Sequence, residues 1–361
     1  MLPKGIQSIS ELCVPPTFSV REVMEQMNVT RVGIALVVVE DNVLVGTVTD
    51  GDLRRAMLAS VDFDGSVQQL LDRKSLAGTS DPVVAQVGIS HADLLAMLQE
   101  SCVSHLPIVD VKMRVVGLAT RSEFLPDPTV KTQAVIMAGG FGTRLQPLCD
   151  EIPKPMLPVG ERPLMELIIE RLRDSGIKQV NVSTHYKREK IMSHFGNGGD
   201  FGVEISYVEE DSPLGTAGAI GLMKTPEETL LVMNGDILTH VDFRAMSFFH
   251  QEHKADFTVA VRAYDVEVPY GVIECEDIWA FALTEKPKQT HFINAGIYLL
   301  EPAVHQYIPK GRHFDMTDLI QCLITNKKRV ATFPIQEYWV DIGQHADYAR
   351  AKEYIEGKGT L

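Results

Sequence analysis

A glycine-rich segment that directly follows an apolar run constrains this chain more than any other feature. Residues 134–138 have the composition of a buried strand, and Gly139-Gly140-Phe141-Gly142 ends the run. Glycines let successive backbone N–H groups converge on an anion, because no Cβ stands in the way. Thr143 and Arg144 close the segment, and an arginine fork suits phosphate oxygens. We therefore predict a strand that leads into a phosphate-binding loop.

A lysine between two prolines follows this loop. In Pro153-Lys154-Pro155 the prolines fix φ and favour an extended neighbour, so Lys154 is held on a stiff segment. Together, Gly-Gly-Phe-Gly-Thr-Arg-Leu and Pro-Lys-Pro resemble the signature of the sugar-1-phosphate nucleotidyltransferases, also called nucleoside-diphosphate-sugar pyrophosphorylases. The resemblance covers nearly all of residues 131–350. It implies an enzyme that joins an NTP to a sugar 1-phosphate and releases pyrophosphate.

Length, charge and cysteine spacing narrow the other possibilities. The 361 residues predict two domains, and the formal net charge of −14 without a basic block argues against binding to nucleic acid or an anionic membrane. Five widely separated cysteines form no metal-ligand spacing and indicate a reducing compartment. The N-terminus lacks an apolar signal core, and the longest apolar run, Ile34–Val39, is too short to span a bilayer. We expect a cytoplasmic protein.

The first 125 residues contain an internal repeat. Residues 46–53 (Gly-Thr-Val-Thr-Asp-Gly-Asp-Leu) correspond to residues 117–124 (Gly-Leu-Ala-Thr-Arg-Ser-Glu-Phe), and each follows a helix, an apolar strand and a turn. The arrangement resembles a tandem pair of CBS domains, the Bateman module, at about residues 1–62 and 63–125, of the α+β class. The resemblance implies a cleft for an adenine nucleotide.

The resemblance also implies which residues of this pair contact the nucleotide. Thr49 and Asp52 match a Thr-x-x-Asp pattern that places a hydroxyl near phosphate and a carboxylate on ribose, whereas Thr120 and Glu123 depart from it by one methylene. Either threonine can instead cap the following helix. Many such pairs act only in packing or oligomerisation, and we expect a homo-oligomer.

A proline-rich linker at residues 126–130 precedes the second domain, residues 131–361. Alternating strand and helix patterns there predict an α/β, Rossmann-like domain with a mixed, mostly parallel sheet and a crevice at the strand ends. A helix is predicted over residues 163–175 and a strand over Gln179–Thr184. His185, after that strand, either contacts a base or lies on the surface.

Two aspartates end apolar strands in this domain. Asp236 follows residues 230–234, and Asp341 lies within residues 338–343. Phosphoryl transfer uses Mg²⁺ held by one or two carboxylates and the substrate phosphates. The resemblance implies that Asp236 and Asp341 bind Mg²⁺; the alternative is that each only caps a turn.

The resemblance assigns roles to the other residues of the site. It implies catalysis by Arg144, Lys154, Asp236 and Asp341, with Arg144 on the leaving pyrophosphate and Lys154 near the α-phosphate. Nucleotide binding is implied for Ala138, Gly139, Gly140, Gly142, Thr143, Gly215 and Thr216. Sugar phosphate binding is implied for Tyr270, Gly271, Glu285, Lys286 and Asn294.

The base and the sugar are less constrained. Phe141 and the segment Leu-Gly-Thr-Ala-Gly at 214–218 resemble the guanylyl and mannose branches, so we expect GTP with mannose or glucosamine 1-phosphate. Cytidylyl, uridylyl or thymidylyl transfer to glucose 1-phosphate is the alternative. A non-catalytic nucleotide sensor is a second one, against which the intact charged residues argue. No hexapeptide repeat follows the last predicted helix, residues 346–355.

Overall fold

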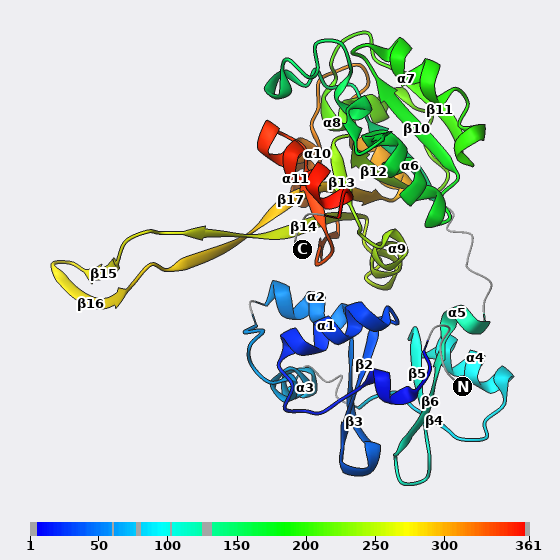
Figure 1. Cartoon of the computed structure of the whole chain (residues 1–361), viewed down its shortest axis with the longest axis vertical. Coiled ribbons are helices and arrows are strands. Elements are labelled where there is room, and N and C mark those ends of the chain that lie inside the picture. The colour runs from blue at the N-terminus through cyan, green and yellow to red at the C-terminus, as the bar shows by residue number, and fades with distance from the viewer. Residues whose placement is uncertain (1–5, 60, 77–80, 102, 125–131, 358–361) are drawn as a thin grey trace. The chain divides into compact units, whose positions relative to one another are not determined.

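The computed structural model describes residues 6–59, 61–76, 81–101, 103–124 and 132–357. The chain divides into two compact units, residues 1–128 and 129–361 (Figure 1). The predicted linker, residues 126–130, lies outside the described residues. Within the described ranges, no helix is both long and apolar enough to cross a lipid bilayer.

The N-terminal unit contains the predicted repeat. Each copy has a three-stranded sheet in which the central strand pairs parallel with one neighbour and antiparallel with the other. The first copy consists of β1 (Cys13–Val14), α1 (Val20–Thr30), β2 (Ile34–Val39), β3 (Val43–Thr49) and α2 (Asp50–Leu58). The following elements are α3 (Val67–Leu76), β4 (Ala85–Gln86), α4 (His91–Glu100), β5 (His105–Val109), β6 (Val115–Thr120) and α5 (Arg121–Phe124).

The two copies share a hydrophobic core. Leu36 of β2 packs in one cluster with Val109 and Leu118 from the second copy, and all three are fully buried. Val43 and Arg114 form an isolated antiparallel bridge between the copies. Burial of apolar surface between the copies therefore stabilises the pair as one unit.

A histidine also joins the two copies. His105 Nε2 lies 2.6 Å from the carbonyl oxygen of Val32, and its ring lies against Gly33. Burial lowers the pKa of His105 to about 4, which outweighs the opposing effect of the Val32 carbonyl. The folded unit therefore holds a neutral imidazole at pH values where the unfolded chain takes up a proton.

This histidine predicts an acid-sensitive N-terminal unit. Because the folded pKa is depressed, the stability it contributes is present above pH 6.5 and is lost as the pH falls toward 4. We expect the free energy of unfolding to fall by at most about 3 kcal/mol over this pH range. The actual loss should be smaller, because His105 keeps some exposed surface. Chemical unfolding of wild type and His105→Gln at pH 7 and 4.5 should show the weaker pH dependence in the variant. His91→Gln, at an exposed histidine, is the control; equal pH dependence in all three proteins would contradict the prediction.

The C-terminal unit has a seven-stranded sheet in the order β11-β10-β7-β12-β17-β14-β18. The strands are β7 (Thr132–Met137), β10 (Gln179–Thr184), β11 (Glu204–Glu209), β12 (Thr229–Asn234), β14 (Phe257–Glu267), β17 (Lys288–Leu300) and β18 (Val330–Pro334). Its helices are α6 (Leu164–Asp174), α7 (Arg188–Phe195), α8 (Gly215–Gly218), α9 (Phe243–Glu252), α10 (Met316–Thr325) and α11 (His345–Ile355). Only β17 runs antiparallel to its neighbours, so the prediction of a mixed, mostly parallel sheet is confirmed.

Hydrophobic cores lie on both faces of this sheet, as expected for parallel strands. Ile136 of β7 packs with α6 on one face, and Val135 packs with α10 on the other. In α6, Leu164, Leu167 and Ile168 are buried as the helical periodicity predicts. Pro163 precedes the helix and does not belong to it.

A long β arm projects from this unit. The outer halves of β14 and β17 form a two-stranded ribbon, which continues as β15 (Val272–Glu276) and β16 (Trp279–Thr284). Figure 1 shows the arm in yellow, with β15 and β16 at its outer end, away from the α/β body. The short pairs β8 (Pro158–Val159) with β9 (Arg162–Pro163), and β13 (Ile237–Thr239) with β19 (Trp339–Asp341), complete the strands.

Candidate active site

The glycine-rich segment directly follows β7, at the end of the sheet where the parallel strands finish. The amide of Ala138 donates to the carbonyl of Ser183 at 3.0 Å, which fixes the start of the loop beside β10. Gly142 has φ +63°, and a Cβ there would lie 2.6 Å from Cys149 Sγ. A larger residue at this position would push the loop off its support. A Cβ at Gly140, in contrast, would meet no described atom within 4 Å, so this part of the loop faces open space.

The two cationic side chains predicted for the site, Lys154 and Arg144, lie beside this loop. Lys154 opens a 3₁₀ helix (Lys154–Met156) and is only 9% exposed. Its ammonium group pairs with Asp236 Oδ2 and lies 4.0 Å from Asp341 Oδ1. Arg144 lies in the 3₁₀ helix Thr143–Leu145, and a guanidinium nitrogen is 3.9 Å from where a Cβ of Gly343 would stand. Four charges predicted from distant segments therefore lie in one cluster.

A short strand pair brings the two aspartates together. After β12, the amide of Gly235 donates to the carbonyl of Met137 at 2.9 Å, and the chain turns into β13. β13 pairs antiparallel with β19, with Ile237 opposite Asp341. The amide of Ile342 also donates to the carbonyl of Asp236 at 2.9 Å. This register places the Asp236 and Asp341 carboxylates next to each other.

The electrostatics of the pair favour a bound cation. Burial and, next, the neighbouring Asp236 raise the pKa of Asp341, while Lys154 and Arg144 oppose that shift. Oδ1 of each aspartate is buried and has no hydrogen-bond partner among the described residues. Polar atoms of this kind are costly unless a ligand satisfies them. The described residues contain no group of three or more metal-ligating side chains. Two carboxylates fit Mg²⁺, which completes its shell with water and substrate phosphates.

The second glycine loop is fastened to the start of α10. Gly215 has φ +79°, and a Cβ there would lie 2.6 Å from Asp315 Oδ1. The amide of Thr216 donates to Asp315 Oδ1 at 2.9 Å, and the Thr216 hydroxyl accepts from the amide of Met316 at 2.8 Å. The side chain of Thr216 is thus bonded within the protein, and the predicted base contact would fall to the loop backbone.

The residues predicted to bind the sugar phosphate lie in two separate parts of the transferase unit. Asn294 lies near the aspartates: it accepts from the amide of Gly296 at 2.9 Å, and a Cβ at Gly296 would clash with Asn234, two residues before Asp236. Gly271 and Glu285 adjoin each other at the base of the β15–β16 hairpin. The amide of Lys286 donates to the carbonyl of Tyr270 at 3.3 Å there. The structure does not bring these four arm residues to the aspartate pair of the same chain.

Comparison with known proteins supplies the family. Residues 133–358 match the family model described as Nucleotidyl transferase. The chain belongs to this family. Residues 6–59 and 74–126 each match the model described as CBS domain, so this nucleotidyl transferase carries two CBS domains before its transferase unit.

Three relatives illustrate the range of the match. The D-glycero-alpha-D-manno-heptose 1-phosphate guanylyltransferase of Aneurinibacillus thermoaerophilus is 36% identical over 62% of this chain and 98% of its own length. The mannose-1-phosphate guanylyltransferase of Mycobacterium tuberculosis is 32% identical over 62% of this chain and 64% of its own length. The UTP–glucose-1-phosphate uridylyltransferase of Synechocystis is 35% identical over 61% of this chain and 62% of its own length. The chain therefore spans nearly all of the first relative and less than two thirds of the other two.

One solved structure supports the fold. A Bacillus anthracis protein in complex with sucrose, provisionally assigned as a glucose-1-phosphate thymidylyltransferase, superposes with a TM-score of 0.52 at 25% identity. The match covers 64% of this chain and 96% of that chain.

One buried acid in the nucleotidyl transferase unit was missed by sequence reasoning. Glu210 is 6% exposed, accepts from the hydroxyl of Ser183 and from the amide of Leu214 at 2.9 Å, and lies beneath Gly139. It therefore connects the two glycine loops. The sequence Glu209-Glu210-Asp211 resembles a solvated acidic turn, but its place at a strand end was a usable signal.

The backbone of Glu210 also supports the aromatic side chains beside the first loop. His185 Nδ1 lies 2.8 Å from the carbonyl of Glu210. Its ring meets Phe141 edge-on, with centroids 5.6 Å apart, and Phe141 also contacts Tyr186. Phe141 is 45% exposed at the loop, so His185 acts here as its support.

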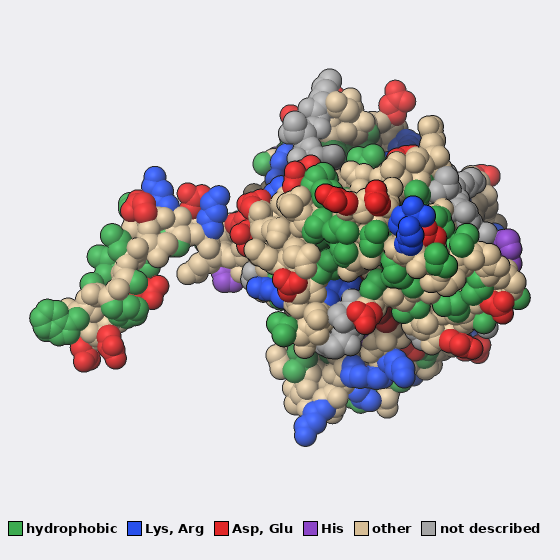
Figure 2. Space-filling model, turned by 90° about the horizontal axis from the view of Figure 1, so that it is seen from below, with side chains coloured by type: hydrophobic (Ala, Val, Ile, Leu, Met, Phe, Trp, Pro, Cys, Tyr) green, Lys and Arg blue, Asp and Glu red, His purple; other side chains and the backbone are tan. Residues whose placement is uncertain are grey.

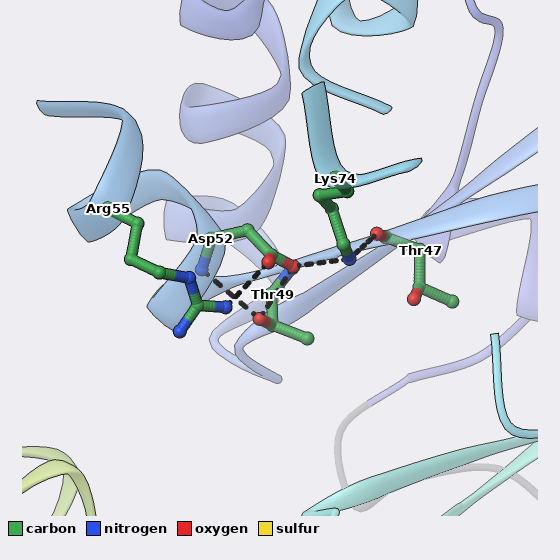
Figure 3. Close-up of polar contacts among 5 residues, drawn as sticks. All are labelled: Thr47, Thr49, Asp52, Arg55 and Lys74. Atoms are coloured by element: carbon green, nitrogen blue, oxygen red, sulfur yellow. Dashed lines mark hydrogen bonds and ion pairs between the residues drawn. The ribbon is translucent and has the colours of Figure 1, made fainter. Parts of the chain in front are cut away.

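In the first CBS domain the Thr49–Asp52 pair forms a helix cap (Figure 3). Thr49 Oγ1 donates to Asp52 Oδ2 at 2.8 Å, and the two backbone amides are satisfied reciprocally. Lys74 Nζ lies 2.9 Å from Asp52 Oδ2, and Arg55 lies 2.7 Å from Oδ1. Burial acts to raise the pKa of Asp52, but Lys74 and the hydrogen bonds outweigh it and lower the pKa. Ribose contact by Asp52 would require it to exchange these partners.

The second CBS domain has a corresponding contact at the start of α5. The backbone amide of Thr120 donates to Glu123 Oε2 at 3.0 Å, and Thr120 is buried. Nucleotide binding by Thr49, Asp52 and Thr120 stays a prediction.

Proposed function

We propose that this chain transfers a guanylyl group from GTP to a mannose-type sugar 1-phosphate, giving a nucleoside-diphosphate sugar and pyrophosphate. The cluster of Lys154, Asp236 and Asp341 beside the open part of the glycine loop carries the proposal. It offers a cation and two buried carboxylate oxygens that accept no hydrogen bond from the described residues, where the parallel strands end. Such a site suits positioning and neutralisation of phosphates.

The reaction requires no side-chain nucleophile. A phosphate oxygen of the sugar 1-phosphate attacks the α-phosphorus in line, and the bond from the α-phosphorus to the oxygen bridging the β-phosphate breaks. Arg144 would bind the leaving pyrophosphate, and Lys154 would turn from Asp236 to the α-phosphate. Asp236 and Asp341 would hold Mg²⁺, which supplies charge neutralisation between the substrates when bound.

The choice of guanine rests on the loops and the relatives. Phe141 and the Leu214–Gly218 turn resemble the guanylyl and mannose branches, and two of the three relatives named above are guanylyltransferases. Their sugars are mannose and a manno-configured heptose, so mannose-type substrates come first and glucosamine 1-phosphate second. Uridylyl transfer to glucose 1-phosphate is the second candidate, because the Synechocystis relative carries that activity at a similar identity.

The CBS pair would regulate this activity by binding an adenine nucleotide. Regulation requires that the nucleotide bind two conformations unequally. The paired Asp52, Lys74 and Arg55 offer such a switch, since ribose and phosphate groups would compete for the same partners.

A pyrophosphate-release screen tests the function. It crosses five NTPs with mannose, heptose, glucose, glucosamine and N-acetylglucosamine 1-phosphates in the presence of Mg²⁺. We expect turnover with GTP and a manno-configured sugar phosphate. Turnover only with UTP and glucose 1-phosphate would select the second candidate. If folded protein releases no pyrophosphate with any substrate pair, the result would favour a non-catalytic nucleotide sensor.

Asp52→Asn should lower the stability of the CBS pair and leave catalysis nearly unchanged. The substitution removes the buried charge that pairs with Lys74 and Arg55, and we expect a loss of about 2 kcal/mol in unfolding free energy of the N-terminal unit. Because the folded pKa of Asp52 is depressed, this contribution exists above the unfolded pKa and disappears as the pH falls through the folded one. Turnover without adenine nucleotide should stay within about twofold of wild type. Thermal unfolding and the pyrophosphate assay measure the two effects; a large loss of turnover below the unfolding midpoint would contradict the separation.

A further inference from the structure

Lys187 is a half-buried cation that lies next to the residues supporting the first glycine loop. Its neighbour Tyr186 contacts the loop through the ring of Phe141, with ring centroids 5.5 Å apart. The Tyr186 hydroxyl also donates to the carbonyl oxygen of Cys149 at 3.4 Å. Cys149 in turn supports Gly142, where a Cβ would be 2.6 Å from the Cys149 Sγ. Lys187 therefore lies within reach of the segment predicted to bind phosphates.

The ammonium group of Lys187 has only neutral partners. Burial raises the pKa of Cys149, and the charges of Lys154 and Lys187 both oppose that rise, so both cations lie near this thiol. Lys154 pairs with the aspartates of the site. Among the described residues Lys187 pairs with no carboxylate: it donates to the carbonyl oxygen of Asp150 and lies 5.1 Å from the centre of the Tyr186 ring. A cation without a counter-charge gains a strong hydrogen bond when an anion arrives.

The backbone of Lys187 is also strained. Its φ of 50° and ψ of 39° lie in the left-handed region, at the residue that precedes α7, and its side chain makes no capping hydrogen bond. Glycine would adopt this conformation at a lower cost than lysine does. Outliers of this kind cluster at ligand-binding segments, where the surrounding structure holds them in place. The conformation thus points to a role for the ammonium group.

The charge balance of the proposed site favours a further cation. A nucleoside triphosphate carries about four negative charges at neutral pH, and a sugar 1-phosphate about two. Arg144, Lys154 and one Mg²⁺ supply about four positive charges, and the aspartate pair removes two of them. Lys286 lies on the β arm, where Figure 2 shows basic and acidic side chains interspersed. The bound substrates therefore carry more negative charge than the cations beside the loop neutralise.

We propose that Lys187 is a further nucleotide-binding residue, whose ammonium group leaves the Asp150 carbonyl and binds the terminal phosphates of the NTP. The inference rests on the proposed function for the identity of the ligand. The terminal phosphates fit better than the α-phosphate, because Lys154 and the aspartates already serve the α-phosphate in the proposed reaction. Lys187 stays protonated throughout and, with Arg144, neutralises charge on the leaving pyrophosphate.

Binding of inorganic tripolyphosphate tests this contact without catalysis. Full-length wild type and Lys187→Gly are titrated calorimetrically with tripolyphosphate, GTP and GMP at one Mg²⁺ concentration. Glycine suits the left-handed backbone, so the variant should unfold close to or above the wild-type midpoint. We expect tripolyphosphate and GTP to bind about ten- to a hundredfold more weakly, because one charge-assisted hydrogen bond is lost. GMP, which lacks the terminal phosphates, should bind as tightly as it does to wild type.

Two further variants separate charge from backbone conformation. Lys327→Gly is the matched control, because Lys327 has φ 54° and is exposed after the end of α10. It should have a similar effect on the unfolding midpoint and leave all three affinities unchanged. Lys187→Arg keeps the charge and should retain tripolyphosphate binding.

The outcomes distinguish the contact from the proposed function. Unchanged tripolyphosphate binding in Lys187→Gly would overturn the contact. Equal losses for GMP and GTP would also overturn it, since Lys187 would then only fix the loop through Asp150. If tripolyphosphate binding weakens as expected but wild type releases no pyrophosphate with any substrate pair, the phosphate contact stands and the proposed function fails.

Discussion

Asparagine in place of Asp236 or Asp341 is expected to reduce pyrophosphate release by a factor of about 10² to 10³. Each substitution keeps the size of the side chain and removes one of the two charges that would hold Mg²⁺ beside the phosphates. Oδ1 of both residues is buried and accepts no hydrogen bond from the described residues. Steady-state assays at saturating GTP and sugar phosphate, repeated over a range of Mg²⁺ concentrations, measure the loss. The apparent Mg²⁺ requirement should rise together with it.

The same substitution at Asp341 should not destabilise the fold. Burial and Asp236 raise the folded pKa of Asp341, so the charged carboxylate opposes folding, and stability falls as the pH rises through that pKa. Asp341→Asn removes this penalty and should unfold at or above the wild-type midpoint at pH 8. Asp242→Asn is the matched control, because Asp242 caps α9 and asparagine caps equally well. An unstable Asp341→Asn protein, or full turnover in it, would contradict the assignment.

Local patterns predicted the elements that surround the site. The apolar run before Gly139 became β7, and Gln179–Thr184 became β10 with the same bounds. The helix after Pro163 follows from the 3.6-residue spacing of leucines that must face the sheet. In these segments the local signal and the tertiary environment agree, because both depend on the burial of the same side chains.

Non-local pairing could not be predicted in the same way. The contact of Asp236 with Asp341 depends on the β13–β19 register, which joins two three-residue strands far apart in the sequence. Strands this short carry almost no periodicity of their own. The family resemblance supplied the pair of aspartates, and the register supplies the physical reason for their proximity.

The arm shows a second limit. Tyr270, Gly271, Glu285 and Lys286 follow the order of the family's sugar-binding segments, but their order along the chain says nothing about the length of the strands between them. β14 and β17 run on well beyond the body, and the ribbon carries these residues outward. Likewise, Thr49 and Asp52 satisfy both a nucleotide-site pattern and a helix cap, and the structure shows the cap.

Lys154→Met should lower turnover by at least about a hundredfold and also change how the protein responds to Mg²⁺. The ammonium of Lys154 is the main counter-charge of Asp236, and it is almost fully buried. Its removal leaves two neighbouring carboxylates that repel each other. In EDTA, we expect the transferase unit to lose about 2–3 kcal/mol of unfolding free energy.

Magnesium should restore that loss, which distinguishes a metal site from an ordinary ion pair. In wild type, Lys154 occupies the place beside Asp236 and competes with the ion, so millimolar Mg²⁺ without substrate should shift the unfolding midpoint only slightly. In Lys154→Met the competition is gone, and a ligand that binds only the folded state stabilises it in proportion to RT ln(1 + [Mg²⁺]/Kd). The variant should therefore gain several degrees from Mg²⁺ while remaining inactive. Lys190→Met, at an exposed pair with Glu151, is the matched control and should show neither effect. If Mg²⁺ shifts all three proteins equally, Asp236 and Asp341 do not form the metal site.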